Sequence, residues 1–372
     1  MLDPRAGQLA RVLCDYSCAV QSGEFVLIEA IDVPHEFSAA LIEAVAARGG
    51  RPLLILKSNQ INRALMQAGS LEQWDLIADI ERQRMQRVQC YIGVRGNPNV
   101  SELSDVPADK QKLYESTVWK RVHHQVRIKQ TRWVVLRWPS ASMAQLAQVS
   151  TEAFEDFYFN VCTLDYARMG RAMRPMVELM QHTDQVHLRG PGETDLRFSI
   201  KGIPAIACDG HLNIPDGEIF TAPVRDSVNG VIQFNCPTMY RGTTHDNVRL
   251  EFKDGRISQA SSTQSARLNE VLNSDEGARY VGEFAIGVNP YCTRPMKDIL
   301  FDEKIAGSIH LTPGSCYDEA SNGNKSDIHW DLVLMQTPEA GGGQMYFDGR
   351  LVRDHGRFVL PELADLNPER LV

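Results

Sequence analysis

The sequence runs Phe25-Val26-Leu27-Ile28, then EFSAALIEAVAA over 36–47, then Arg48-Gly49-Gly50, then Leu53-Leu54-Ile55-Leu56, and this stretch decides the fold. Short apolar runs of this kind are typical of buried parallel strands. The segment between them has helical spacing and stops at a glycine pair, which is a signal for a helix C-terminus. Strand, helix and strand in this order predict a parallel sheet with helices on its faces.

The same alternation continues on both sides of this stretch. Gln8 to Val20 has apolar residues at helical spacing, and Val88–Val94 and Trp133–Trp138 read as further strands. No GxGxxG motif follows the first strand and no GxxxxGK[ST] motif occurs, so the sheet lacks the glycine-rich loops of dinucleotide and nucleotide triphosphate sites. We therefore expect an N-terminal α/β domain over residues 1–182. Its last part, Ser142 to His182, is expected to be largely helical, with Ser142 as N-cap, and to bridge two domains.

Beyond His182 the sequence pattern changes to short strand-like runs separated by Gly, Pro, Asn and Asp. These runs are Val186–Leu188, Asp195–Ile200, Val231–Phe234 and Val248–Phe252. Lys253-Asp254-Gly255-Arg256 predicts a hairpin, and one helix is expected near Gln264 to Ser274. Residues 183–372 are thus expected to form a second, β-rich α+β domain.

Composition narrows the class of protein. The chain has 372 residues, 43% of them hydrophobic, with a formal net charge of -8, so nucleic acid is a poor prior partner. No secretory signal is visible and no apolar run approaches the ~20 residues that cross a bilayer. The eight cysteines are scattered without a CxxC pair, which favours free thiols in a reducing cytoplasm. Cys14 and Cys18 lie one helical turn apart, which favours helix packing over a two-ligand metal pair.

A basic stretch precedes the last of these N-terminal strands. It comprises Lys120, Arg121, Arg127, Lys129 and Arg132, with His123 and His124 inside it. The simplest interpretation is a solvated helix face that ends at a strand. Contact with a substrate carboxylate or with a partner stays open as an alternative.

Polar residues that a fold would not need occur in four segments of the second domain. Glu218 follows the turn residues Pro215 to Gly217, Glu283 interrupts an apolar run, and His310 lies within another. A buried carboxylate such as Glu283 must be paired, hydrogen-bonded or bound to a metal. In a strand, His329 and Asp331 would project from the same face. Mixed nitrogen and oxygen donors suit zinc, manganese or cobalt.

Each residue alone also has an ordinary structural role. Glu218 after a turn is commonly a turn or cap residue, Glu283 could pair with a buried cation, and a histidine in an apolar strand is more often a core residue. His329-x-Asp331 alone is a weak motif. The combination carries the prediction. Because no cysteine falls in a structural zinc spacing within these segments, a catalytic site is favoured over a closed structural one.

The four segments resemble a known signature. PDGEIFTAP (215–223), Gly282-Glu283, GSIH (307–310) with Tyr317, and IHWD (328–331) occur in the order found in the aminopeptidase T and aminopeptidase S family of metallopeptidases. The likeness extends to Asp302-Glu303-Lys304, to Asn213 and Asn229-Gly230, and to the segment from Tyr16 to Gly23. It covers nearly the whole chain. The resemblance implies an N-terminal α/β domain, a C-terminal catalytic domain, a homodimer, and two divalent metal ions in a cavity.

The resemblance also assigns roles residue by residue. The family's metal ligands match Glu218, Glu283, His310, His329 and Asp331, and its tyrosine matches Tyr317. Glu283 is also expected to act as general base and Tyr317 to donate a hydrogen bond to the oxyanion. The expected reaction is hydrolysis of amino-terminal residues from peptides. Asp302 or Glu303 could lie near the substrate ammonium group, but neither is assigned to it.

A similar fold with other chemistry is the main alternative. Ring-cleaving dihydroxypyridine dioxygenases resemble this family but hold one ferrous ion with two histidines and one aspartate. In that class we expect a histidine at the position of Glu283 and no glutamate matching Glu218. The presence of both acids favours two metals and hydrolysis. A binding protein without activity is a further alternative.

Overall fold

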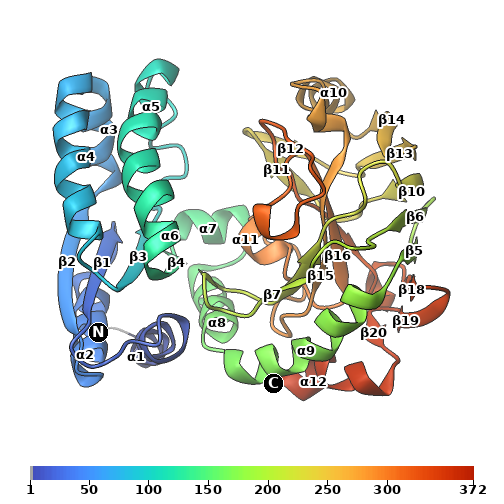
Figure 1. Ribbon diagram of the computed structural model, residues 1–372, viewed down its shortest axis with the longest axis horizontal. Coiled ribbons are helices and arrows are strands. Elements are labelled where there is room, and N and C mark those ends of the chain that lie inside the picture. The colour runs from blue at the N-terminus through green and yellow to red at the C-terminus, as the bar shows by residue number, and fades with distance from the viewer. Residues whose placement is uncertain (1–2) are drawn as a thin grey trace. The chain divides into compact units, whose positions relative to one another are not determined.

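The structure is a computed structural model that describes residues 3–372 (Figure 1). The backbone forms two compact units. The first runs to Thr163 and includes Gly210–Pro215, and the second comprises Leu164–Asp209 and Asp216–Val372. The domain boundary that we expect after residue 182 stays a prediction. Among the described residues, no helix combines the length and the apolar character needed to cross a membrane.

The first unit is built on a five-stranded sheet in the order β2-β1-β3-β4-β8. All of its pairings are parallel, which confirms the prediction from the alternating pattern. Its strands are β1 (Phe25–Ile31), β2 (Arg51–Lys57), β3 (Cys90–Gly96), β4 (Arg132–Trp138) and β8 (Asn213–Ile214). The chain winds from β1 to β2 on one side and then returns to β3 on the other, as in doubly wound folds.

Helices flank this sheet. They are α1 (Pro4–Arg11), α2 (His35–Ala47), α3 (Asn59–Ala68), α4 (Leu71–Met85), α5 (Ala108–Tyr114), α6 (Ile128–Gln130), α7 (Ala141–Leu146) and α8 (Thr151–Cys162), with π-helical segments η1 (Val12–Ser17) and η2 (Glu115–Arg127). Helix α4 packs against η2, and α1 packs against α2. The N-cap predicted at Ser142 is wrong, because Ser140 caps α7 and Ser142 lies inside it. Ser150 then caps α8, so the helical stretch is divided.

Strands β1 and β2, which contain the apolar runs Phe25–Ile28 and Leu53–Leu56, differ in burial. Strand β1 lies between β2 and β3 and is mostly buried. Strand β2 is at the sheet edge, where Leu54 is 39% exposed and Leu56 is 51% exposed. The apolar run therefore predicted the strand but not its position, since an edge strand with an apolar surface has the same local pattern as a buried one.

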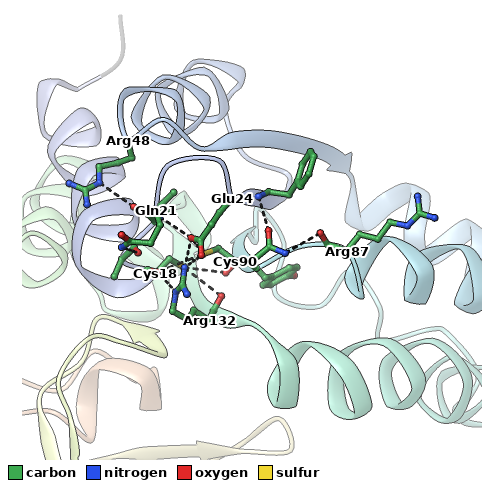
Figure 2. A network of polar contacts seen from close by, with 12 residues as sticks. Cys18, Gln21, Glu24, Arg48, Arg87, Cys90 and Arg132 are labelled. Atoms are coloured by element: carbon green, nitrogen blue, oxygen red, sulfur yellow. Dashed lines mark hydrogen bonds and ion pairs between the residues drawn. The ribbon is translucent and has the colours of Figure 1, made fainter.

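A polar network ties the amino-terminal ends of three strands together (Figure 2). The Arg132 Nη2 donates to the Cys90 Sγ at 3.2 Å, and its Nε donates to the Cys18 carbonyl at 2.8 Å. Arg132 also pairs with Glu24, just before β1. The Cys18 thiol donates to the Tyr91 carbonyl at 3.6 Å. The interaction with Cys18 and the charge of the Arg132 guanidinium lower the pKa of the Cys90 thiol against the effect of burial. Arg132 of the basic stretch thus has a structural partner.

The rest of the basic stretch divides between surface and core. Arg121 is paired with Asp75 and Asp79 on α4. His123 and Arg127 are each only 5% exposed. The guanidinium of Arg127 lies over the Trp133 ring at 4.3 Å from the centroid. The predicted solvated face therefore describes part of the stretch and not these two residues.

The second unit contains two larger antiparallel sheets. The eight-stranded sheet has the order β14-β13-β10-β6-β5-β18-β19-β20 and the five-stranded sheet the order β17-β16-β15-β9-β7. The strands of the first are β5 (Gln185–Arg189), β6 (Asp195–Ser199), β10 (Asn229–Gln233), β13 (Arg249–Lys253), β14 (Arg256–Ser261), β18 (Gln344–Phe347), β19 (Arg350–Asp354) and β20 (Arg357–Phe358). Those of the second are β7 (Ile206–Cys208), β9 (Glu218–Thr221), β15 (Val281–Gly287), β16 (Ser308–Pro313) and β17 (Leu332–Met335). The predicted β-rich α+β class is confirmed.

Other elements complete this unit. They are a small hairpin of β11 (Thr238–Tyr240) and β12 (Thr243–His245), and helices α9 (Tyr166–His182), α10 (Ser265–Leu272), α11 (Ile299–Asp302) and α12 (Pro368–Leu371), with 3-10 turns at Gly277–Arg279, Asp318–Ala320, Pro338–Ala340 and Pro361–Leu366. The predicted hairpin joins β13 to β14, with Asp254 and Gly255 both at positive φ. The predicted helix near Gln264 is α10.

Candidate metal centre

One face of the five-stranded sheet carries most of the residues singled out by the sequence. Glu218 on β9 lies opposite Gly287 of β15, and His310 on β16 lies opposite Ala285. Glu283, Ala285 and Gly287 alternate along β15 and therefore share a face, which Glu218 and His310 also share. Three adjacent strands thus direct Glu218, Glu283 and His310 to one side of the sheet.

Small residues make room for these side chains. Ala285 and Gly287 occupy the positions of β15 that lie between the larger groups. A Cβ added to Gly287 would lie 2.4 Å from the Ile305 carbonyl oxygen, far closer than a carbon atom can approach. The sequence Glu-Phe-Ala-Ile-Gly over 283–287 therefore places one acid and two small residues on the same face.

Glu283 is at the centre of the group. Its Oε1 lies 2.9 Å from the His310 Nε2, and its Oε2 lies 3.6 Å from the His329 Nε2. Glu218 approaches from the other side, with its Oε2 3.8 Å from the His310 Nε2. All three of Glu218, Glu283 and His310 are more than nine-tenths buried.

His329, which forms an isolated β-bridge with Gly314, and Asp331 lie directly before β17, outside the strand itself. Their side chains still converge, because the His329 Nε2 is 3.3 Å from the Asp331 Oδ1. The other ring nitrogen of His329 lies 2.8 Å from the Ser315 carbonyl oxygen, and Thr312 donates to Asp331 at 2.6 Å. These contacts fix both side chains toward Glu283.

Potential metal-ligand atoms form three groups at this face, and the groups share residues. Glu218, Glu283 and His310 form one group, Glu283, His329 and Asp331 a second, and Glu303, His310 and Asp331 a third, each with ligand atoms within 4.8 Å of one another. Glu283, His310 and Asp331 each belong to two groups. The structure therefore brings the predicted residues together and adds Glu303.

Glu303 was left unassigned by the sequence, although it was noted beside Lys304. Lys304 is 1% exposed, and its ammonium contacts Glu303 and lies 3.6 Å from the Glu218 Oε1. The sequence signal for Glu303 was its place in the charged triplet Asp302-Glu303-Lys304, which precedes the apolar run that holds His310. Asp302 has another role, because its Oδ1 accepts the Met296 amide at 2.6 Å, and burial raises its pKa to about 8.

Tyr317 borders the group. Its ring centroid lies 4.8 Å from that of His329 and 5.6 Å from that of Phe220. The side chain is 48% exposed, and its hydroxyl makes no hydrogen bond within the described part of the chain. The phenol is therefore available to an incoming molecule beside His329.

The concentration of buried acids at this face shifts the pKa values of the residues around it. Burial lowers the pKa of His310, but the hydrogen bond with Glu283 and the charges of Glu218 and Asp331 raise it to about 10. Asp331 and Glu283 likewise raise the pKa of His329 to about 9 against the effect of burial. Burial raises the pKa of Glu218 well above its ordinary value. The carboxylates of this group therefore favour a positively charged group between them.

Several buried atoms of the group lack hydrogen-bond partners. They are the Glu218 Oε2, the Glu283 Oε2 and the His310 Nδ1, among the described residues. An unsatisfied buried acceptor is costly, and a divalent cation would satisfy several at once. The donor set of carboxylate oxygen and imidazole nitrogen fits zinc, manganese or cobalt. These residues therefore fit a divalent metal ion.

Comparison with known families gives one match that spans nearly the chain. The family described as Thermophilic metalloprotease (M29) matches residues 2–346. Aminopeptidase AmpS of Bacillus subtilis (strain 168) is 31% identical over 169 residues, which are 41% of this chain and 40% of the relative. Aminopeptidase T of Thermus thermophilus is 32% identical over 190 residues, 44% of each. The aligned part thus spans less than half the length of these relatives.

Solved structures share the fold. Wild-type AmpT from Thermus thermophilus superposes with a TM-score of 0.74 at 21% identity, over 96% of this chain and 99% of that chain. The 2,5-dihydroxypyridine dioxygenase from Pseudomonas putida KT2440 superposes with a TM-score of 0.63 at 13% identity, over 96% and 98%. At these identities the likeness supports the architecture of each part and not the chemistry.

Proposed function

Since the chain belongs to the thermophilic metalloprotease (M29) family, we propose that it is a metal-dependent aminopeptidase that releases amino-terminal residues from peptides. The observation that carries this proposal is the convergence of Glu218, Glu283, His310, His329 and Asp331, with shared use of Glu283 and His310. The names of the aminopeptidase relatives support it.

We infer that the centre holds two divalent ions, with zinc, cobalt or manganese as candidates. One ion would be held by Glu218, Glu283 and His310, and the other by Glu283, His329 and Asp331. Glu283, with one oxygen facing each histidine, is placed to belong to both sets. Divalent ions supply polarisation of a carbonyl group and lower the pKa of water from ~15.7 to about 7.

The protein's own groups then have distinct tasks. Glu283 accepts a proton from the attacking water, because it is the buried carboxylate that faces both histidines of the centre. Tyr317 donates a hydrogen bond to the oxyanion that forms, because its hydroxyl is free of described partners beside His329. Lys304 holds Glu218 and Glu303 in place through its buried ammonium.

The dioxygenase alternative is not favoured. An iron site of that class uses two histidines and one carboxylate, whereas Glu218 and Glu283 add two further carboxylates here. One iron per chain together with oxygen-dependent turnover would contradict the peptidase proposal.

The direct test uses the full chain freed of metal and then supplied with zinc, cobalt or manganese. Release of chromogenic product from amino-terminal leucine substrates is expected with at least one metal, together with two bound ions per chain by mass spectrometry. Lack of turnover on a panel of amino-terminal substrates with every metal would favour a binding role.

We also propose a homodimer and a cytoplasmic location. The first unit exposes apolar side chains that a partner would cover, among them Leu56 on β2, Ile61 on α3 and Leu76 on α4. Large exposed apolar side chains grouped on one unit favour an interface. All eight cysteines are free, as expected in a reducing compartment.

A further inference from the structure

One sulfur atom lies among buried carboxylates at the edge of the candidate centre. Cys208 on β7 is registered opposite Glu218 on β9, so the two side chains share a face. Asp216 completes the group, since its ligand atom, that of Glu218 and the Cys208 Sγ all lie within 4.8 Å of one another. We propose that Cys208, Asp216 and Glu218 form a third cation site, which takes a thiophilic divalent ion such as cadmium or excess zinc.

The backbone holds this group in a fixed shape. The Gly217 amide donates to the Asp216 Oδ1 and to the Cys208 carbonyl, both at 3.1 Å. The Asn289 Nδ2 donates to the Asp216 carbonyl at 2.7 Å. A Cβ at Gly217, whose φ is +130°, would lie 2.8 Å from the Asn289 Cβ. The turn that joins Asp216 to Glu218 therefore requires glycine and sets the spacing of the two carboxylates.

The donor set differs from that of the neighbouring centre. Asp216 is 3% exposed and Glu218 is 8% exposed. The Glu218 Oε2, which also faces the His310 Nε2 at 3.8 Å, has no hydrogen-bond partner among the described residues. A thiolate with two carboxylates prefers softer ions than a set of oxygen and nitrogen donors. The Lys304 ammonium contacts Glu303 and lies 3.6 Å from the Glu218 Oε1, so its single positive charge is shared between Glu303 and the three donors and offsets only part of their negative charge.

Binding would occur without a redox change. The S–H bond of Cys208 breaks, its proton passes to solvent, and the sulfur electron pair forms the bond to the cation. Because Glu218 is also a ligand of the proposed centre, an ion at the third site would draw this carboxylate away. Inhibition by excess zinc follows, and this consequence alone rests on the proposed function.

A purely apolar role for Cys208 is the competing explanation. Its side chain packs beside Ile203 and Ile206 on the cluster that contains Phe220. A cysteine that only fills space there would bind no cation. The two roles can be distinguished by ultraviolet absorption, because only a cysteine that binds cadmium gives a cadmium–thiolate band.

The test uses the full-length protein loaded with manganese and titrated with cadmium. The wild type is expected to gain the ultraviolet charge-transfer band of a cadmium–thiolate bond, saturating at one cadmium per chain. Cys208→Ser is expected to lose this band. Cys316→Ser, a change at another partly exposed cysteine that belongs to none of the ligand groups, is expected to keep it. Absence of the band in the wild type, or an equal band in Cys208→Ser, overturns the proposal.

Inhibition of turnover by zinc is an independent second test of the third site. The zinc concentration that halves turnover is expected to rise at least tenfold in Cys208→Ser and to stay unchanged in Cys316→Ser. Equal inhibition of all three proteins would overturn the inhibitory role. If the band appears but no peptide is cleaved with any metal, the proposed function fails while the third site stands.

Discussion

Glu283 is the single residue on which the proposed chemistry depends most. Its oxygens face His310 at 2.9 Å and His329 at 3.6 Å. We expect Glu283→Gln to lower kcat by roughly 10²–10⁴-fold, because an amide carries no charge and accepts no proton from water. The measurement is kcat for release of amino-terminal leucine, with the metal content of the same sample.

The control for this change is Glu270→Gln, which alters an exposed glutamate of α10 and should leave kcat unchanged. Full turnover of metal-loaded Glu283→Gln would show that another group takes the proton. Glu303, which lies within 4.8 Å of ligand atoms of His310 and Asp331, would be the next residue to change.

His123 makes stability depend on pH. Burial lowers its pKa from 6.5 to about 4, against the attraction of Glu29. Between these values the unfolded chain binds a proton that the folded chain does not. The free energy of unfolding therefore falls as pH drops from 6.5 towards 4. The full loss from this one group is roughly 3 kcal/mol.

Chemical unfolding of the wild type and of His123→Leu across this pH window measures the effect. The variant should lose less stability on acidification than the wild type. His124→Leu, a change at the exposed neighbour, is the matched control and should keep the wild-type slope. Identical slopes for wild type and His123→Leu would show that the buried imidazole does not titrate in this way.

At the scale of elements, local pattern predicted the strands that carry Glu218, Glu283 and His310. An acid or a histidine inside an apolar run is visible without knowing its partners. The cross-strand register is not visible, and it is the register that places Cys208 opposite Glu218. Glu303 was missed as a ligand candidate for the same reason, because its contact with Lys304 and its proximity to His310 arise from tertiary packing.

The helical elements show a similar limit. The periodicity from Ser142 to His182 predicted helix but not the breaks between α7, α8 and α9, where Ser150 and Asp165 serve as caps. The apolar run of β2 did not reveal an edge strand. Position within a sheet depends on which strands pair, and that information is nonlocal.

Strand β15 depends on the small size of Gly287. A methyl group there would meet the Ile305 carbonyl oxygen at 2.4 Å. We expect Gly287→Ala to lower the free energy of unfolding by about 1–3 kcal/mol and to weaken metal binding, because the strand must shift beside Glu218. Unfolding curves and metal titration measure both effects.

Gly7→Ala in α1 is the control for this substitution. Its new methyl group would meet only the Arg11 Nη1 at 3.9 Å. This change should be neutral or stabilising by up to ~1 kcal/mol. If Gly287→Ala were equally harmless, the close approach of β15 to the Ile305 carbonyl would not constrain the centre.

At the scale of the whole molecule, the exposed apolar residues of the first unit bear on association. Leu56 is 51% exposed on the edge strand β2. If the chain forms a homodimer through this strand, Leu56→Lys should shift the mass measured by light scattering from dimer towards monomer. Val359→Lys, a change at an apolar residue that is 46% exposed in the second unit, should not. A wild-type monomer at all concentrations contradicts the homodimer.

The sheet that carries Glu218, Glu283 and His310 also limits how this protein can change in length. Within a strand, one inserted residue turns every following side chain to the opposite face. An insertion in β9, β15 or β16 would therefore remove a donor from the group while leaving the sheet intact. The segment 288–307 joins β15 to β16 and lies outside this register. Changes in length are therefore expected only in the part of such a connection that does not contact the centre, because Glu303, Lys304 and Ile305 of this segment pack against it.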